Sequence, residues 1–279
     1  MTALIDRIAR FPERLIAAGG YRIGIRESGA GRPIVLLHGI GSGAGSWLYQ
    51  FEQLAPHFRV IAWDAPGYGR SAPITAVAPR ALDYAAALRA LVVALELHRP
   101  LIVAQSLGAI IGTAYANRYD EHLSGLLLLG PASGYGASRA DVRAEKLKGR
   151  LDSFEQLGAA RLAAERSANL LGPNASPEAL ELVRIHMAAL NADGHAQAAR
   201  LLAYADTATD ARHYRGPTLV ACGSADRVTP EAGCRAIAAA FPTADYRSLA
   251  DLGHASYVDG PAMVNALIIE FAATLGAWS

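Results

Sequence analysis

The stretch LIVAQSLGAIIGTAYANRYD, residues 101–120, decides the fold because its pattern changes in the middle. Residues 101–104 form a short, unbroken apolar run, which is typical of a strand covered on both faces. From Leu107 onward the apolar residues follow helical spacing. Ser106 lies between the two patterns, with a small residue two positions to either side. The sequence therefore predicts a strand, a tight turn that carries a serine, and a helix.

The rest of the chain continues this alternation. A hairpin turned at Gly19-Gly20 comes first, with strands at 15–18 and 21–27. Further strand-like runs lie at 34–37, 59–63, 101–104, 123–129, 218–222 and 244–249. Helical patterns lie at 47–54, 81–97, 107–119, 231–241 and 262–275. Apolar strands that alternate with helices favour a mostly parallel sheet covered on both faces.

One segment, residues 133–215, contains helical stretches but no convincing strand. Ser176 is a candidate helix cap because a proline follows it at the first helical position, and Gly194 is interpreted as a helix end. Turn-rich sequences bound the segment on both sides. We therefore expect an α/β core made of residues 1–132 and 216–279, with a helical cap, 133–215, inserted after the sixth strand.

Composition restricts the class of protein. The chain has 279 residues, of which 52% are hydrophobic and 18% charged, and its formal net charge is +1. These values predict a substantial core and argue against nucleic acid or an anionic membrane as a partner. Cys222 and Cys234 are interpreted as buried free thiols. The N-terminal segment mixes acidic and basic residues and is not typical of a signal peptide or a transmembrane span, so we expect a cytoplasmic protein.

Ser106 is the candidate nucleophile. A serine on a strained strand-to-helix turn projects above the sheet, and the residues two before and two after it must be small because the backbone approaches its neighbours closely. Ala104 and Gly108 meet this requirement. The ordinary alternative for a serine before a helix is an N-cap. The catalytic interpretation also needs a base, because a serine hydroxyl is a poor nucleophile by itself.

His254 and Asp226 are the candidate partners of Ser106. His254 lies in LADLGHASYVDGP after the last strand, and Asp226 lies in VACGSADRVTP after the seventh. The imidazole would take the serine proton, and the carboxylate would orient the imidazole and stabilise its protonated form. All three residues follow the carboxyl ends of strands, which is where sites form in open parallel sheets. Asp251, three residues before His254, is interpreted as a turn former.

A glycine-rich loop follows the third strand in IVLLHGIGSGAGSW, residues 34–47. Its glycines allow backbone N–H groups to approach a ligand, and the start of the helix at Leu107 directs further N–H groups toward Ser106. We therefore assign the oxyanion hole to the backbone N–H groups of Ile40 and Leu107. His38 is expected to shape this loop without transferring a proton. The expected residues of the substrate pocket are Gly39, Gly41, Trp47 and Gln105.

These motifs carry a resemblance to a known family. The chain resembles the α/β-hydrolase superfamily in His38-Gly39 with Gly41, in DAPGYGRS at 64–71, in the Ser106 turn, in GSADRVTP and in GHASYVDGP. The resemblance covers nearly all of the chain except the helical insertion. It implies the α/β-hydrolase fold, with a mostly parallel eight-stranded sheet, helices on both faces and a cap, and it implies a serine hydrolase.

The resemblance also limits the chemistry. Residues 196–230 are similar to enol-lactone hydrolases and small carboxylesterases, which implies a small-molecule ester or lactone as substrate. Gln105 and Ala104 depart from the histidine and glycine often found at these positions. Dehalogenases and epoxide hydrolases of this fold carry an aspartate nucleophile, so Ser106 argues against both. Carbon–carbon bond hydrolases keep the serine and are the nearest alternative.

Two other classes stay open at this point. Gly39-Ile-Gly41-Ser-Gly-Ala44 matches the dinucleotide-binding pattern G-x-G-x-x-A, and Asp64 lies where that pattern places a ribose-binding acid. Against this alternative, a hairpin precedes the strand, and the serine, aspartate and histidine would be left unexplained. The third class is a small-molecule receptor that keeps the fold and its pocket without turnover.

The insertion also contains a basic pattern. Arg139, Arg143, Lys146 and Arg150 fall on one stripe if their segment is helical. A solvated basic face is the simpler interpretation, and binding of an anionic substrate is the alternative. No metal-binding motif occurs, so neither a metal nor another cofactor is expected. The sequence does not indicate an oligomeric state.

Overall fold

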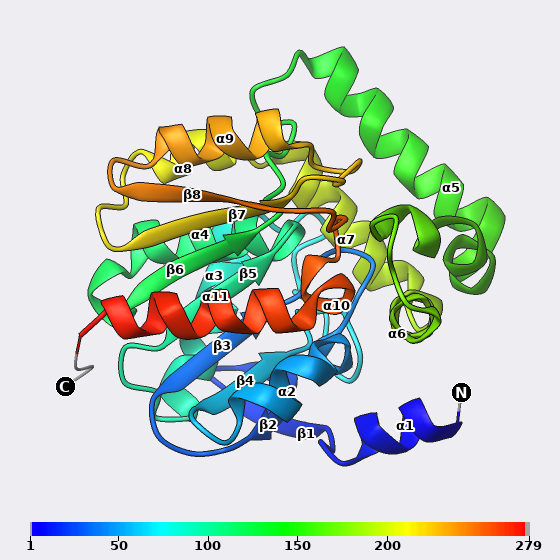
Figure 1. Cartoon of the computed structure of the whole chain (residues 1–279). Helices are drawn as coiled ribbons and strands as arrows, with labels where there is room; N and C mark the ends of the chain where they lie inside the picture. Colours follow the sequence, from blue (N-terminus) through cyan, green and yellow to red (C-terminus); the bar gives the residue numbers. More distant parts are fainter. Residues whose placement is uncertain (1, 277–279) are drawn as a thin grey trace.

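The computed structural model describes residues 2–276; residues 1 and 277–279, which the predicted core includes, lie outside the described residues. Eight strands form one sheet in the order β1-β2-β4-β3-β5-β6-β7-β8 (Figure 1). The strands are β1 Arg14–Ala18, β2 Tyr21–Ser28, β3 Pro33–Leu37, β4 Arg59–Trp63, β5 Leu101–Gln105, β6 Gly125–Leu129, β7 Thr218–Gly223 and β8 Ala244–Leu249. The predicted mostly parallel eight-stranded sheet is confirmed.

The direction of the strands follows from their connections. β1 and β2 pair antiparallel across the turn at Gly19 and Gly20, whose positive φ values of 52° and 89° suit glycine. β2 also pairs antiparallel with β4, whereas all later neighbours pair parallel. Each parallel connection passes through a helix or a longer helical segment. The carboxyl ends of the parallel strands therefore share one edge of the sheet.

Helices cover both faces of the sheet, as the unbroken apolar strands require. Helices α3 (Ala81–Ala94), α4 (Leu107–Arg118) and α9 (Glu231–Ala240) cover one face, and α2 (Leu48–Leu54) and α11 (Pro261–Thr274) cover the other (Figure 1). Successive residues of a central strand enter opposite cores: Ile102 and Ala104 pack on the first face, and Leu101 and Val103 on the second. The sheet is thus buried on both faces.

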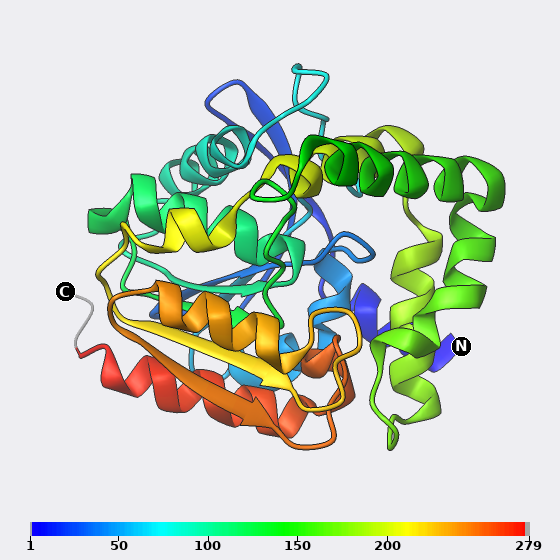
Figure 2. The ribbon, with the colours of Figure 1, turned by 90° about the horizontal axis from the view of Figure 1, so that it is seen from above.

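The insertion after β6 is helical, as predicted. It contains α5 (Ala140–Arg166), η3 (Ser167–Leu170), α6 (Pro177–Ala188), α7 (Ala192–Tyr204) and α8 (Thr207–Ala211). Helix α5 packs on both α6 and α7, and the three helices lie beside one end of the sheet (Figures 1 and 2). The five residues of α8 instead pack on α4 and α9 and so belong to the layer that covers the sheet.

Two glycines shape the cap. Gly158, with φ of 66°, breaks the regular backbone of α5 and lets this helix turn back. Gly194 is not the helix end that the sequence predicted, since it lies in the first turn of α7. There the Asn191 side chain caps the helix by accepting a hydrogen bond from the Gly194 N–H. A Cβ on Gly194 would lie 1.9 Å from the carbonyl oxygen of Gly67, so only glycine allows this contact between cap and core.

The remaining helices are short or terminal. Helix α1 (Thr2–Ala9) precedes β1, η1 (Ala44–Trp47) precedes α2, η2 (Asp120–His122) precedes β6, and α10 (Ser256–Asp259) precedes α11. No helix within residues 2–276 combines the length and the apolar character needed to cross a membrane. Cys222 and Cys234 are buried free thiols, as predicted.

Candidate functional site

The turn at Ser106 has the strained backbone that the sequence predicts. Ser106 has φ of 53° and ψ of −114°, and its side chain forms no helix-capping hydrogen bond. A non-glycine residue with positive φ is uncommon and is held in place only by its surroundings. Here the Ser106 N–H donates to the Leu129 carbonyl at 3.0 Å, and the Ser106 carbonyl accepts from Ala109 and Ala132. Ser106 therefore occupies the N-cap position of α4 without capping the helix through its side chain.

Small residues are required around this turn. A Cβ on Gly108 would lie 2.4 Å from the carbonyl oxygen of Leu37. Ala104 is fully buried, and a Cβ on Gly112 would lie 3.1 Å from its methyl group. The helix α4 thus crosses very close to β3 and β5, which keeps the serine at the edge of the sheet.

His254 and Asp226 come together at the same edge. The His254 Nδ1–H donates to Asp226 Oδ2 at 2.8 Å, and both side chains are about 5% exposed. Asp226 Oδ1 accepts the backbone N–H groups of Val228 and Thr229, each at 2.8 Å. Burial opposes ionisation of Asp226, but His254 and the hydrogen bonds from Thr229 outweigh it and lower the pKa of the carboxyl group. Asp226 is therefore held as an anion facing the imidazole.

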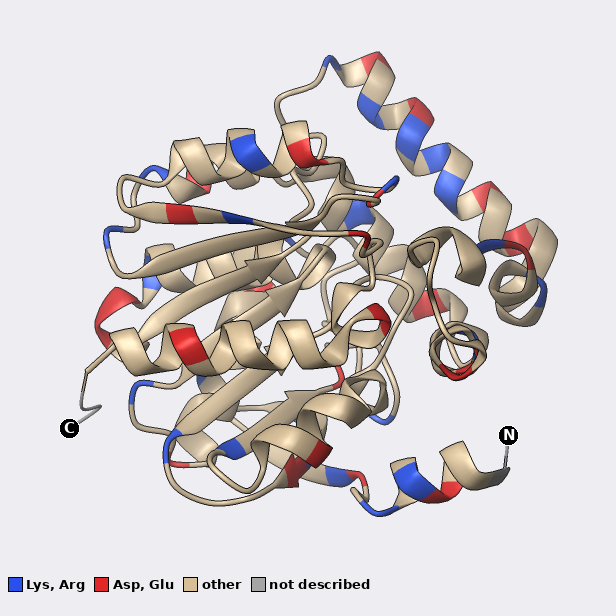
Figure 3. Cartoon of the chain, in the orientation of Figure 1, with Lys and Arg blue, Asp and Glu red and all other residues tan. Residues whose placement is uncertain are grey.

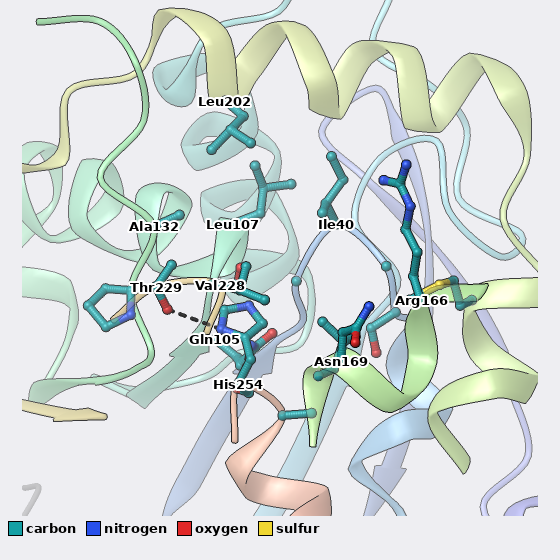
Figure 4. A pocket seen from close by; sticks show the side chains of 18 of the residues that line it. Ile40, Gln105, Leu107, Ala132, Arg166, Asn169, Leu202, Val228, Thr229 and His254 are labelled. Atoms are coloured by element: carbon teal, nitrogen blue, oxygen red, sulfur yellow. Dashed lines mark hydrogen bonds between the residues drawn. The ribbon is translucent and has the colours of Figure 1, made fainter. Parts of the chain in front are cut away.

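Thr229 is a site residue that sequence reasoning missed. Its hydroxyl lies 2.8 Å from Asp226 Oδ2, 3.0 Å from the Gly130 carbonyl and 3.1 Å from His254 Nδ1 (Figure 4). Gly130, with φ of 48°, leaves room for this cluster, since a Cβ there would lie 2.9 Å from Asp226 Oδ2. The one indication in the sequence is that Thr229 follows Asp226 by three residues. The role of the Thr229 hydroxyl also depends on the turn after β6, and the sequence does not show that this turn lies beside Thr229.

Ser106 and His254 line one cavity of about 520 Å³ between the sheet edge and the cap. Gln105 connects the two loops, because its Nε2 donates to the His254 carbonyl at 3.1 Å. Gly39 brings in the third loop: a Cβ there would lie 3.0 Å from Ser106 Cβ. Gly41 also lines the cavity. Within residues 2–276 the Ser106 hydroxyl forms no hydrogen bond with His254.

Two residues that line this cavity, Ile40 and Leu107, have backbone amides with no acceptor among residues 2–276. Leu107 is the first residue of α4, so its N–H has no acceptor within the helix. Neither this N–H nor that of Ile40 donates to an atom of residues 2–276. Both residues line the cavity (Figure 4). These amides are the two that the sequence assigns to an oxyanion hole.

His38 holds the glycine-rich loop after β3, in agreement with the sequence analysis. Its Nδ1–H donates to the Gly39 carbonyl at 2.8 Å, and its Nε2 accepts the Ala65 N–H at 3.0 Å. Burial lowers the pKa of His38 to about 4. A neutral imidazole with both nitrogens engaged fixes the backbone and has no free position for proton transfer.

Trp47 does not line the cavity, which corrects the expectation from the sequence. The 3₁₀ turn at Ala44–Trp47 directs this side chain into the core on the α2 side, where it is fully buried. Its ring packs on Tyr257, with centroids 4.0 Å apart, and Tyr257 lines the cavity instead. Asp251 is exposed, with φ of 60°, and its backbone N–H bonds Ser224, as a turn former would.

The glycine-rich loop does not form a dinucleotide site. Asp64, the candidate ribose ligand, is only 6% exposed, and its Oδ1 accepts the Ala44 N–H at 2.8 Å. A Cβ on Gly69 would lie 2.5 Å from Asp64 Oδ2. The carboxylate is thus enclosed by its own loops. Within residues 2–276, no three His, Cys, Asp or Glu side chains gather in a way that would hold a metal ion.

The cap supplies the far wall of the cavity. Its apolar contributors are Leu162, Leu170, Val183, Met187, Leu190 and Leu202, and its polar ones are Arg150, Arg166, Asn169 and His195. Figure 3 shows several Lys and Arg residues along α5. Of the four residues in the predicted basic stripe, only Arg150 lines the cavity; Arg139 pairs with Asp141, Arg143 bonds backbone carbonyls, and Lys146 is exposed.

Comparison with known proteins agrees with this architecture. Residues 32–261 match the model of the alpha/beta hydrolase fold family. The chain is 34% identical over 122 residues to 2-hydroxy-6-oxo-6-phenylhexa-2,4-dienoate hydrolase of Comamonas testosteroni, a match that covers 42% of each chain. The matched segment thus spans well under half of that relative.

Solved structures are similar over almost the whole chain. A thermophilic esterase from Thermogutta terrifontis superposes with a TM-score of 0.85 and 23% identity, covering 95% of this chain and 99% of that one. The enol-lactonase from Burkholderia xenovorans LB400 gives 0.80 and 23%, covering 93% and 100%. At these identities the structural match shows the fold alone. The family match over most of the chain shows that this protein belongs to the alpha/beta hydrolase fold family.

Proposed function

We propose that the chain is a serine hydrolase that cleaves a small carboxylic ester or a lactone. The observation that carries this proposal is the shared cavity: the strained Ser106, His254 and the two residues with unpaired amides, Ile40 and Leu107, all line it, and buried Asp226 bonds His254 from behind. A nucleophile, an oriented base and oxyanion donors are the parts that acyl transfer needs.

The proposed reaction has two steps. Ser106 Oγ attacks the carbonyl carbon while His254 Nε2 takes its proton, and the oxyanion accepts hydrogen bonds from the Ile40 and Leu107 amides. The tetrahedral intermediate then expels the alcohol, which takes the proton back from His254. Water attacks the acyl-enzyme with His254 as base, and the acid leaves as Ser106 is restored. Asp226 stabilises the imidazolium in both steps.

Turnover of 4-nitrophenyl acetate and butyrate tests this proposal. We expect saturable hydrolysis by the wild-type chain, and a loss of at least about 10⁴-fold in kcat in Ser106→Ala, because the covalent route is removed. Ser138→Ala, outside the cavity, is the matched control. Saturable binding of both esters with no turnover would identify a receptor and reject the hydrolase.

Carbon–carbon bond hydrolysis is the second candidate, favoured by the similarity to the dienoate hydrolase of Comamonas testosteroni. The two candidates share the serine, the base and the oxyanion donors, so substrate preference separates them. The decisive comparison is kcat/KM for 4-nitrophenyl butyrate against that for 2-hydroxy-6-oxo-6-phenylhexa-2,4-dienoate, followed by loss of its absorbance. A larger value for the dienoate would replace the ester proposal with this second one.

A further inference from the structure

The cap side of the cavity carries positive charge without a matching acid. Arg150 and Arg166 both line the cavity from α5, and none of the cavity-lining residues is an aspartate or a glutamate. Among residues 2–276, the Arg166 side chain bonds only the Ser153 hydroxyl, at 2.6 Å. The Arg150 side chain forms no hydrogen bond or ion pair with any of these residues. Two guanidinium groups beside a largely apolar cavity favour an anionic ligand there.

His195 adds an unsatisfied donor or acceptor to the same region. This residue of α7 is only 6% exposed, and its Nδ1 has no hydrogen-bond partner among the described residues. Its ring stacks on Phe154 with centroids 4.4 Å apart, which fixes its orientation. Leaving a buried polar atom unpaired is unfavourable, so such an atom beside a cavity is well placed to bond a ligand.

The charges of both arginines reach this imidazole. Burial, and then Arg150 and Arg166, lower the pKa of His195 to about 4. The ring is therefore neutral near pH 7 and offers one N–H, while the positive charge comes from the guanidinium groups. The charge of Arg150 also acts on Tyr68, whose hydroxyl bonds the Ile40 carbonyl, so this charge lies near the oxyanion loop.

We propose that Arg150, Arg166 and His195 form a carboxylate subsite, so that the substrate is an ester or lactone with a free carboxylate away from the bond that is cleaved. This inference rests on the proposed function and adds the substrate class. A carboxylate matches the flat donor pairs of guanidinium groups and can accept a further N–H. Arg166 and Asn169 stand across the cavity from Thr229 and Ala132 (Figure 4). The apolar cap side chains between these walls would contact the carbon chain.

A matched pair of esters tests the subsite. Mono-4-nitrophenyl adipate and 4-nitrophenyl hexanoate have the same chain length and differ in a terminal carboxylate or methyl group. We expect the wild-type chain to give the larger kcat/KM with the adipate ester. In the Arg150→Gln/Arg166→Gln double variant the adipate-to-hexanoate ratio of kcat/KM should fall by at least about tenfold, as expected for lost charged hydrogen bonds. Lys146→Gln removes one exposed charge from the same helix and should leave the ratio unchanged.

Binding without turnover separates this inference from the proposed function. Monomethyl adipate and methyl hexanoate are titrated calorimetrically into Ser106→Ala protein, with and without the single change Arg166→Gln, whose side chain is exposed at the cavity. Tighter binding of monomethyl adipate, weakened by Arg166→Gln, supports the subsite even if no ester is hydrolysed. The subsite is rejected if the adipate-to-hexanoate ratio of kcat/KM is the same in wild type and double variant and if the two methyl esters bind equally well. Stronger competition by phenyl phosphate than by adipate would also overturn it, in favour of a phosphate.

Discussion

Replacing Asp226 by asparagine tests the geometry of the proposed triad in detail. Asp226 Oδ1 accepts two backbone N–H groups, from Val228 and Thr229, so the amide oxygen of an asparagine must take this position. The NH₂ group then faces His254 Nδ1, where Oδ2 now lies at 2.8 Å. It would donate to Nδ1 and force the imidazole proton onto Nε2. In that tautomer His254 has no free lone pair toward Ser106.

The expected loss in Asp226→Asn is large because two effects add. The base has the wrong tautomer, and the imidazolium that forms during attack loses its counter-charge. A change of this kind lowers kcat by about 10⁴-fold, or about 5 kcal/mol of transition-state stabilisation. The assay is initial-rate hydrolysis of 4-nitrophenyl butyrate, with a thermal melt of each variant to confirm folding.

Asp251→Asn is the matched control for this variant. Asp251 is exposed and has a positive φ, which asparagine tolerates well. We expect its activity and melting temperature to stay close to those of the wild type. If Asp226→Asn kept activity within tenfold of wild type, or if Asp251→Asn alone abolished turnover, the assignment of the acid would be wrong.

Three further predictions follow from individual contacts. Thr229→Val removes the hydroxyl shared by Asp226 and His254 and should lower kcat by roughly tenfold or more, as steady-state rates with a folded variant will show; an unchanged kcat would contradict this positioning role. Gly108→Ala should destabilise the fold by about 1–3 kcal/mol in urea unfolding, because its Cβ would lie 2.4 Å from a carbonyl oxygen, whereas Gly149→Ala, where a Cβ meets no atom within 4 Å, should not. Burial gives His38 a low pKa, so below about pH 6.5 the unfolded chain binds a proton at this residue that the folded chain does not, and the free energy of unfolding falls as the pH is lowered. Between pH 7.5 and 5 His38 should account for about 2 kcal/mol of this fall, measured as the difference between wild type and His38→Gln in the pH dependence of the free energy of unfolding. The same pH dependence in both proteins would refute this prediction.

The fold was predictable where local sterics determine it. The change from a four-residue apolar run to helical spacing at Ser106 located β5 and α4, and the small residues there reflect backbone contacts that the structure contains. Ser106, Asp226 and His254 each follow a strand, and the carboxyl ends of parallel strands share one edge of the sheet, so the sequence predicts that all three residues lie at this edge. This inference needed no knowledge of side-chain orientation.

The errors arose where a third segment decides the outcome. The sequence predicts Trp47 in the pocket, but the 3₁₀ turn that points its side chain into the core depends on how the loop after β3 packs. The sequence also predicts a helix end at Gly194, whereas the contact of Gly194 with Gly67 depends on the packing of the cap on the core. Thr229 was missed because its hydroxyl acquires a role only beside Gly130, which lies 99 residues earlier in the chain. Sequence periodicity carries no information on such contacts.

The proposed mechanism requires that Ser106 is a nucleophile activated by His254. Treatment of the folded protein with a fluorophosphonate, followed by peptide mapping by mass spectrometry, tests it directly. We expect one phosphonyl group on Ser106 in the wild type, none at this residue in Ser106→Ala, and strongly slowed labelling in His254→Ala. Ester hydrolysis by a protein that stays unlabelled, or labelling at another residue with Ser106 unmodified, would contradict the claim.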